Sequence, residues 1–213
     1  MAKRILFQGD SITWNGRKDQ EPYTLGAGFA AMVAGELAVD YPDEYEFINR
    51  GVCGNKIVDV YKRIKKDFIN LKPDYASIYV GFNDVCMEAT ENNGVDTEKF
   101  EMVYCMLLDE IYEALPNIKL MLIAPYFFDK TSALTTDAPE KSEMVKKGIM
   151  EKVEAVRRIA KKYNIPHIEL QAAFDEMMEK TPATVWAGDG AHPTVCGHEI
   201  IKRLWLETFE KIK

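Results

Sequence analysis

Two short blocks near opposite ends of the chain carry the side chains that acyl transfer requires. The first, GDSIT, ends a strand-like run on Gly9 and places the hydroxyl of Ser11 just beyond it. The second, DGAHP, places Asp189 shortly before His192. A serine hydroxyl becomes nucleophilic when an imidazole takes its proton, and a carboxylate on Nδ1 keeps Nε2 directed at the serine. We therefore predict Ser11 as nucleophile, His192 as base and Asp189 as the residue that orients it.

Two further blocks, NRGVCGN and GFND, contain donors for the oxygen that becomes negative when an ester carbonyl turns tetrahedral. We expect an oxyanion hole built from the backbone N–H groups of Ser11 and Gly54 and the amide of Asn83. Neighbouring acidic residues have plainer roles. Asp10 is expected to brace the turn through backbone hydrogen bonds, and Asp84 to cap whatever follows GFND.

Short apolar runs alternate with longer helical patterns along the chain, which favours an α/β fold. We expect strands at 4–8, 46–50, 75–81, 119–125 and 167–170, and helices near 26–40, 56–70, 97–115, 142–163, 171–180 and 194–212. Strand–helix–strand repetition predicts a three-layer α/β/α domain, and residues 1–213 are interpreted as one domain. Two stretches, 86–97 and 126–142, are expected as excursions beyond the carboxyl ends of strands, where open sheets bind ligands.

Composition narrows the possible partners. The chain has 213 residues, a net charge of −7 and a pI near 5.1. This charge disfavours nucleic acid and anionic membranes as partners, since both select clustered Lys and Arg. No run approaches the length of a membrane span or a signal peptide, so a cytoplasmic location is expected. The cysteines lack metal-binding spacing and are expected to be reduced; three of them, Cys53, Cys86 and Cys196, adjoin the blocks described above.

Together, GDSIT, the glycine of NRGVCGN, GFND and DGAHP resemble the SGNH (GDSL) hydrolases, in family order and across nearly the whole chain. The resemblance implies a flavodoxin-like, five-stranded parallel sheet and a Ser-Asp-His hydrolase of esters or thioesters that needs no cofactor and no metal. Carried over, Ser11, Asp189 and His192 form the triad, and Gly54 and Asn83 complete the oxyanion hole.

A narrower resemblance is to bacterial intracellular acetylxylan esterases, carried by FQGDSITWNGR, FINRGVCGN, PDYASIYVGFNDV, ELQAAFDEMM and HPTVCGHEIIKR. It implies a small-molecule substrate, acetylated short xylan oligosaccharides. The chain departs from that pattern at Trp14, at Cys86 and in the spacing of Trp186 from Asp189, which alters the rim of the pocket.

Substrate-binding roles are assigned to three residues beside the blocks. Trp14 and Trp186 can stack on a sugar ring or simply pack. Arg17 can bind substrate or tie down its loop. His198, further along the last helix, is expected in a core or interface role. That helix carries more apolar residues than are needed for one face that packs on the core. Because similar esterases are also often homo-oligomers, a homo-oligomer is expected.

Other functions stay open. Family members also include lysophospholipases, thioesterases and aryl esterases. A metallophosphoesterase is suggested by Gly9-Asp10, GFND and Gly197-His198, but the additional DxH and GHxH ligands of such enzymes are missing from the sequence. A flavodoxin-like binding module without catalysis is the third alternative.

Overall fold

The computed structural model describes residues 2–18, 21, 23–128 and 139–213. Its centre is a parallel sheet of five strands in the order β2-β1-β3-β4-β5. The strands are β1 (Lys3–Gly9), β2 (Tyr45–Gly51), β3 (Tyr75–Tyr79), β4 (Lys119–Ala124) and β5 (His167–Glu169). The predicted α/β class and five-stranded parallel sheet are thus confirmed, with strand bounds within two residues of those expected.

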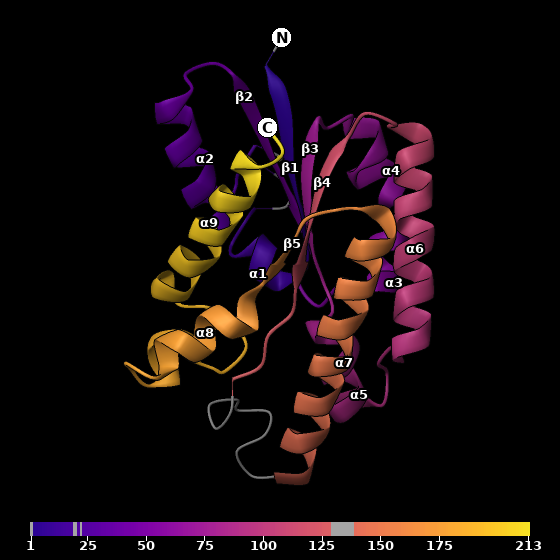
Figure 1. Cartoon of the computed structure of the whole chain (residues 1–213), viewed down its shortest axis with the longest axis vertical. Helices are drawn as coiled ribbons and strands as arrows, with labels where there is room; N and C mark the ends of the chain where they lie inside the picture. The colour runs from indigo at the N-terminus through magenta and orange to yellow at the C-terminus, as the bar shows by residue number, and fades with distance from the viewer. Residues whose placement is uncertain (1, 19–20, 22, 129–138) are drawn as a thin grey trace.

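Helices cover both faces of this sheet, which gives three layers (Figure 1). On one face lie α2 (Phe29–Asp40), α8 (Leu170–Met178) and α9 (Val195–Glu210). On the other lie α3 (Ile57–Lys62), α4 (Ile64–Asp67), α5 (Phe82–Glu91), α6 (Thr97–Ala114) and α7 (Pro139–Tyr163). The shorter elements are α1 (Ser11–Trp14) and the 3₁₀ turns η1 (Ile69–Leu71) and η2 (Ala183–Val185).

The middle strands are apolar because both of their faces are covered. All five residues of β3 are buried, and Ile5, Leu6 and Phe7 of β1 have no exposed surface. Leu6 packs into the core beneath α3, α6 and α7, while Ile5 and Phe7 pack into the core beneath α2 and α9. This is the pattern expected of parallel strands between two helical layers.

The register aligns the strand ends that carry the chemistry. Gly9, the last residue of β1, pairs with Gly51 of β2 and with Tyr79 of β3. The segments that follow these three strands therefore leave the sheet at the same level. They meet at the carboxyl edge, which is where α/β sheets bind ligands.

Two predicted segments differ in the structure. The helix expected over 56–70 is broken into α3, α4 and η1, with the first break at Arg63. The stretch 86–97, expected as an irregular excursion, continues α5 as far as Glu91. That helix forms because Phe82, Val85 and Cys86 fall on one buried face, and it ends at Asn92, whose φ of 53° is left-handed. Of the excursion expected at 126–142, residues 129–138 lie outside the described residues.

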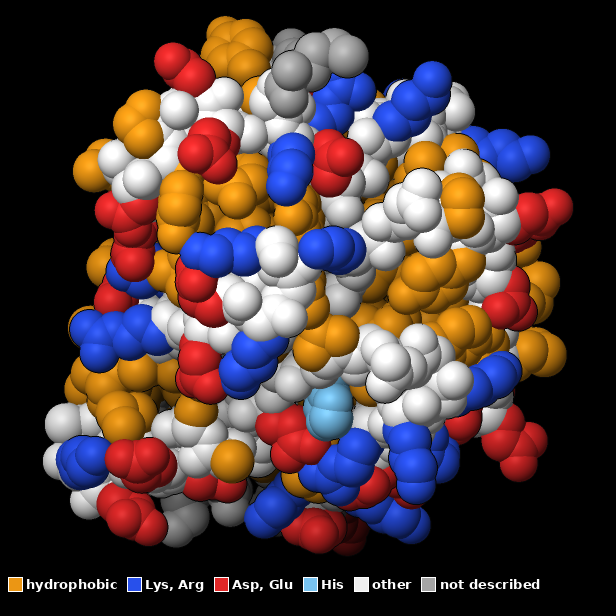
Figure 2. All heavy atoms as spheres, turned by 45° about the horizontal axis from the view of Figure 1, so that its top comes forward, with side chains coloured by type: hydrophobic (Ala, Val, Ile, Leu, Met, Phe, Trp, Pro, Cys, Tyr) orange, Lys and Arg blue, Asp and Glu red, His pale blue; other side chains and the backbone are white. Residues whose placement is uncertain are grey.

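The face at one end of the molecule is mixed in charge. Figure 2 brings forward the end of the molecule where both termini lie, and there acidic and basic side chains are interspersed between small apolar areas. Within the described ranges, no helix combines the length and apolar character needed to cross a membrane.

Candidate active site

The nucleophile candidate lies in a tight connection between β1 and α1. Ser11 is the first residue of α1, and Asp10 caps this helix by accepting from the N–H of Ile12 at 3.0 Å. Gly9 is required here because a Cβ at this position would lie 2.3 Å from the carbonyl oxygen of Tyr79. Asp10 therefore braces the turn, as predicted, and holds Ser11 at the carboxyl edge of the sheet.

The three triad candidates form a hydrogen-bonded line with His192 in the middle. Ser11 Oγ is 2.9 Å from Nε2 of His192, and Nδ1 of His192 is 2.7 Å from Oδ2 of Asp189. A proton on Nδ1 is thus directed to the carboxylate, which leaves Nε2 to accept from the serine. The arrangement can activate the hydroxyl as a nucleophile.

The loop that carries Asp189 and His192 is closed at its base. Ala187 and Pro193 form an antiparallel bridge, and the N–H of Thr194 donates to the carbonyl of Trp186 at 2.8 Å. From the other side, the buried hydroxyl of Tyr126, just after β4, donates to Ala191 O at 2.6 Å. These hydrogen bonds fix the position of the loop, and with it the imidazole of His192, although the loop has little regular secondary structure.

Asp189 remains an anion at neutral pH. Partial burial raises the pKa of its carboxyl, but hydrogen bonds from the His192 ring and from the backbone N–H groups of His192 and Ala191 outweigh this, so the pKa lies below its ordinary value. Those two backbone bonds, at 2.7 and 2.9 Å, both end on Oδ1. Oδ2 is thus left to the imidazole.

Two of the predicted oxyanion donors come from neighbouring segments: Gly54 lies in the loop after β2, and Asn83 lies at the start of α5. Residues 52–55 form a β-turn closed by the bond from Asn55 N to Val52 O, and Gly54 has the positive φ, 74°, that the third position of a type II turn requires. Asn83, in the first turn of α5, donates one amide N–H to the carbonyl of Asn55 at 3.2 Å. An amide has two N–H donors, so this bond orients Asn83 and leaves its second N–H for a ligand.

Asp84 caps a different helix from the one expected. Both of its carboxylate oxygens accept from the N–H of Ile57, at 3.1 and 3.3 Å, so it caps α3 rather than the helix that contains it. The contact ties the 51–56 loop to α5. Burial raises the pKa of Asp84 to about 7, and the same cause raises that of buried Asp10 to about 7.

A cavity of about 270 Å³ opens beside Ser11. Besides Ser11, the cavity is lined by Ile12, Trp14, Asn15, Cys53, His192, Pro193 and His198. One indole, one thiol and several polar groups therefore face whatever molecule enters. Such a lining suits a small, partly polar ligand.

His198 is buried, as the sequence indicated, yet it also contributes to this cavity. Its Nδ1 accepts from the N–H of Phe29 at 3.1 Å, and its Nε2 contacts the side-chain amide of Asn15. Burial lowers the pKa of His198 to about 4, and the charge of His192 acts in the same direction. The ring is neutral near pH 7, and because Nδ1 accepts from the Phe29 N–H, its single proton lies on Nε2.

The other two substrate-binding candidates occupy different surroundings. Arg17 is buried and donates to the carbonyl of Gly51 at 3.0 Å. Of the two roles expected for it, substrate binding or holding its loop in place, this contact fits the second. Trp186 is half-buried and packs against the core beneath α9, and its backbone closes the loop that carries His192. Of the thiols, Cys53 and Cys196 are exposed, whereas Cys86 is buried in α5.

No metal site emerges from the described part of the chain. Within it, no three His, Cys, Asp or Glu side chains gather closely enough to hold an ion. The two-metal arrangement of a phosphoesterase therefore has no candidate ligand set among these residues.

Known proteins with similar sequences and folds include acetylxylan esterases. The model of the GDSL-like lipase/acylhydrolase family matches residues 7–200. The acetylxylan esterase of Geobacillus stearothermophilus is 31% identical over 215 residues, spanning 96% of this chain and 93% of that protein. The crystal structure of an acetylxylan esterase from that organism matches with a TM-score of 0.83 at 29% identity, covering 97% of this chain and 93% of that one. An α/β hydrolase from the Lake Arreo metagenome, at 24% identity, shares the fold with a TM-score of 0.84 over 99% of this chain and 97% of its own.

Proposed function

Because the chain belongs to the GDSL-like lipase/acylhydrolase family and is a carboxylic ester hydrolase, we propose that it removes short acyl groups, acetyl above all, from carbohydrate such as acetylated xylo-oligosaccharides. The reaction runs through an acyl-enzyme on Ser11. The observation that carries this proposal is the hydrogen-bonded line from Asp189 through His192 to Ser11 at the mouth of a small cavity.

The first half-reaction forms the acyl-enzyme. His192 Nε2 takes the proton of Ser11 as Oγ attacks the ester carbonyl, and the imidazolium that results is stabilised by ionised Asp189. When the tetrahedral intermediate collapses, the imidazolium gives its proton to the departing sugar oxygen. In the second half-reaction His192 takes a proton from the water that attacks the acyl carbon, and it gives this proton to Ser11 Oγ as the acid is released.

The developing oxyanion is stabilised by N–H donors at the same edge. The N–H of Ser11 opens α1 and so has no partner in the preceding turn of that helix. The N–H of Gly54 comes from a turn, and the second amide N–H of Asn83 from the first turn of α5; hydrogen bonds already fix both segments. Preorganised donors of this kind stabilise the transition state without rearranging during the reaction.

The substrate class rests on the cavity and on the relatives. Trp14 offers a flat apolar face on which a sugar ring stacks, and Asn15 and Cys53 add polar groups to the same lining. A similar structure, 29% identical, is described as an acetyl-xylooligosaccharide esterase. A long acyl chain would need more apolar volume than a cavity of about 270 Å³ supplies, which disfavours a lysophospholipase.

Replacing the nucleophile tests the mechanism. Ser11→Ala should abolish turnover of 4-nitrophenyl acetate while leaving the circular dichroism spectrum and the melting temperature unchanged. Activity that survives in purified Ser11→Ala, after contaminating wild-type enzyme has been excluded, would refute the serine mechanism.

The substrate class is tested separately. Acetate release is measured from acetylated xylo-oligosaccharides and acetylated monosaccharides, and fatty-acid or acyl release from lysophospholipid, acyl-CoA and phenyl acetate. The highest kcat/KM is expected on the xylo-oligosaccharides. A higher kcat/KM on lysophospholipid, acyl-CoA or phenyl acetate would replace the carbohydrate assignment with the corresponding class.

A further inference from the structure

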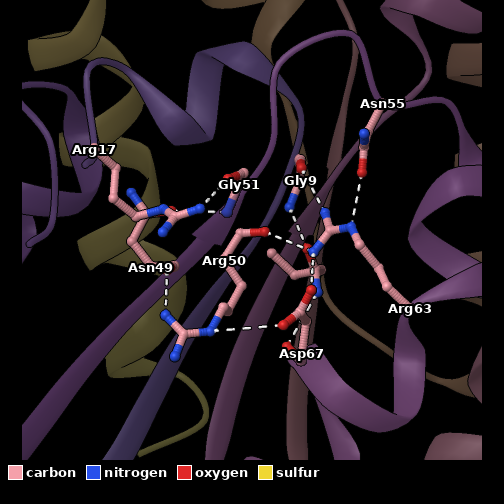
Figure 3. Close-up of polar contacts among 9 residues, drawn as sticks. Gly9, Arg17, Asn49, Arg50, Gly51, Asn55, Arg63 and Asp67 are labelled. Atoms are coloured by element: carbon pink, nitrogen blue, oxygen red, sulfur yellow. Dashed lines mark hydrogen bonds and ion pairs between the residues drawn. The ribbon is translucent and has the colours of Figure 1, made fainter. Parts of the chain in front are cut away.

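Arg63 connects the two loops on which the proposed chemistry depends. It occupies the break between α3 and α4, with a backbone (φ −108°, ψ 11°) that departs from the helices on either side. Its side chain is only 15% exposed. Figure 3 shows the guanidinium directed into the space between Gly9, Asn55 and Asp67, beneath the carboxyl ends of the strands.

All three nitrogens of this guanidinium donate. NH2 binds the carbonyl of Gly9 at 3.1 Å, and Nε binds Oδ1 of Asn55 at 2.7 Å. NH1 binds the carbonyl of Arg50 at 2.8 Å and the carboxylate of Asp67 at 3.3 Å. The planar fork of an arginine can reach acceptors in several directions at once, whereas a lysine has a single nitrogen.

Two of these acceptors adjoin catalytic groups. The Gly9 carbonyl lies at the end of β1, one residue before the Asp10 cap that holds Ser11. Asn55 closes the turn that contains Gly54, and its own carbonyl accepts from the amide of Asn83. The guanidinium thus spans from the nucleophile's strand to the loop that sets both other oxyanion donors.

We infer that Arg63 is a positioning residue that fixes the distance between Ser11 and the oxyanion donors Gly54 and Asn83, and that it does so through Gly9 and Asn55. This inference rests on the proposed serine mechanism. Arg63 touches no substrate in this role. Its effect should appear in the rate of the chemical step and little in substrate binding.

The decisive variant is Arg63→Lys, which keeps the positive charge and loses the fork. We expect kcat on 4-nitrophenyl acetate to fall about 10- to 100-fold, because small displacements of reacting groups and lost oxyanion contacts have effects of this size, with KM little changed. A kcat within about twofold of wild type, or a loss confined to KM, would overturn the inference.

Chemical rescue separates positioning from general destabilisation. In Arg63→Ala, added ethylguanidinium should restore part of the lost kcat, whereas ethylammonium at the same concentration should not. Equal effects of the two cations would contradict the role of the planar guanidinium. So would the absence of rescue in a variant that keeps the wild-type circular dichroism spectrum. If Arg63→Ala does not fold, Arg63→Lys alone decides.

A double-mutant cycle tests the route through Asn55. Asn55→Ala removes the acceptor of Nε but keeps the backbone carbonyl that binds Asn83. If Arg63 acts through Asn55, the loss of kcat in the double variant with Arg63→Lys should be smaller than the product of the single losses. Fully multiplicative losses would show that the two residues act independently and would overturn the route.

Two controls keep this test distinct from that of the proposed function. Arg158→Lys alters an exposed arginine that pairs with Glu101 between α7 and α6, and kcat should stay at the wild-type value. Ser11→Ala is assayed in parallel. An active Ser11→Ala would refute the serine mechanism itself, whereas an inactive Ser11→Ala with a fully active Arg63→Lys would refute only the role of Arg63.

Discussion

At the residue scale, Asp189 shows how one carboxylate serves two purposes. Oδ1 accepts from two backbone N–H groups and so shapes its own loop, while Oδ2 holds the imidazole of His192. The same bonds lower the pKa of the Asp189 carboxyl, which keeps it ionised at neutral pH. The second purpose can be removed without the first.

Asp189→Asn makes that separation. The amide oxygen can still accept from the backbone, but the amide nitrogen facing Nδ1 favours the tautomer in which Nε2 carries the proton and cannot accept from Ser11. We expect kcat to fall by about 10⁴-fold, as for the equivalent change in other triads, with KM little affected. The melting temperature should stay close to wild type. A kcat loss below tenfold would contradict the orienting role.

Some residues at this scale could be found from the sequence and others could not. Ser11, Asp189 and His192 were predicted because their side-chain types define a chemistry and their blocks occur in family order; the structure brings them within hydrogen-bond distance. Arg63 and Tyr126 gave no such signal. Their main partners include backbone carbonyls, which every residue has, so only the folded chain reveals what they hold.

At the scale of elements, the strands were easier to predict than the helices around the site. Buried parallel strands are apolar throughout, and that pattern is visible in the sequence. By contrast, α5 was missed because the residues at and after its end, Thr90, Asn92, Asn93 and Gly94, favour loops; its stability comes from the face buried against the core. The break at Arg63 has no Gly or Pro to mark it.

Asp84 links α5 to the start of α3, and its titration should change the free energy of unfolding with pH. Burial raises the pKa of this carboxyl from 3.8 to about 7 although the Ile57 N–H and Lys152 oppose the shift. Between those values the folded chain keeps a proton that the unfolded chain has released. The stability linked to Asp84 is therefore present below pH 3.8 and lost as the pH rises to about 7.

Asp84→Asn cannot ionise and still offers an oxygen to Ile57. We measure the free energy of unfolding of this variant and of wild type by urea denaturation at each pH. The difference, variant minus wild type, should increase by up to about 3 kcal/mol from pH 5 to pH 8, because only wild type loses stability when Asp84 ionises. Asp96→Asn is the matched control. A hydrogen bond from the Lys99 N–H lowers the pKa of Asp96, so this variant should show a constant difference over the same range. A constant difference for Asp84→Asn would contradict the assignment.

At the scale of the whole molecule, most of the apolar side chains of α9 pack against the core of the same chain. Its surplus of large side chains led to the prediction of a homo-oligomer. In the structure Ile201, Trp205 and Phe209 have no exposed surface, and Ile200, Leu204 and Leu206 pack against the same core. The surplus is thus used within one chain, and the homo-oligomer stays a prediction that light scattering can test.

Trp205 is the residue through which α9 supports the sheet. Its indole lies 5.4 Å from the ring of Phe7 in β1 and 5.0 Å from that of Phe209, measured between ring centroids. The strand that presents Ser11 is therefore packed directly against the last helix of the chain. Removing this side chain leaves a large cavity at the centre of one of the two cores.

Trp205→Ala should lower the free energy of unfolding by about 3–5 kcal/mol, as expected for loss of a buried aromatic side chain. Trp205→Phe should lose less, since a ring still fills most of the space and the indole N–H, which has no partner among the described residues, disappears. Val195→Ala, at a position of the same helix that is 73% exposed, should change stability by less than about 0.5 kcal/mol. Urea denaturation compares all three. If Trp205→Ala were as mild as Val195→Ala, the packing of α9 on β1 would not be what holds the strand before Ser11 in place.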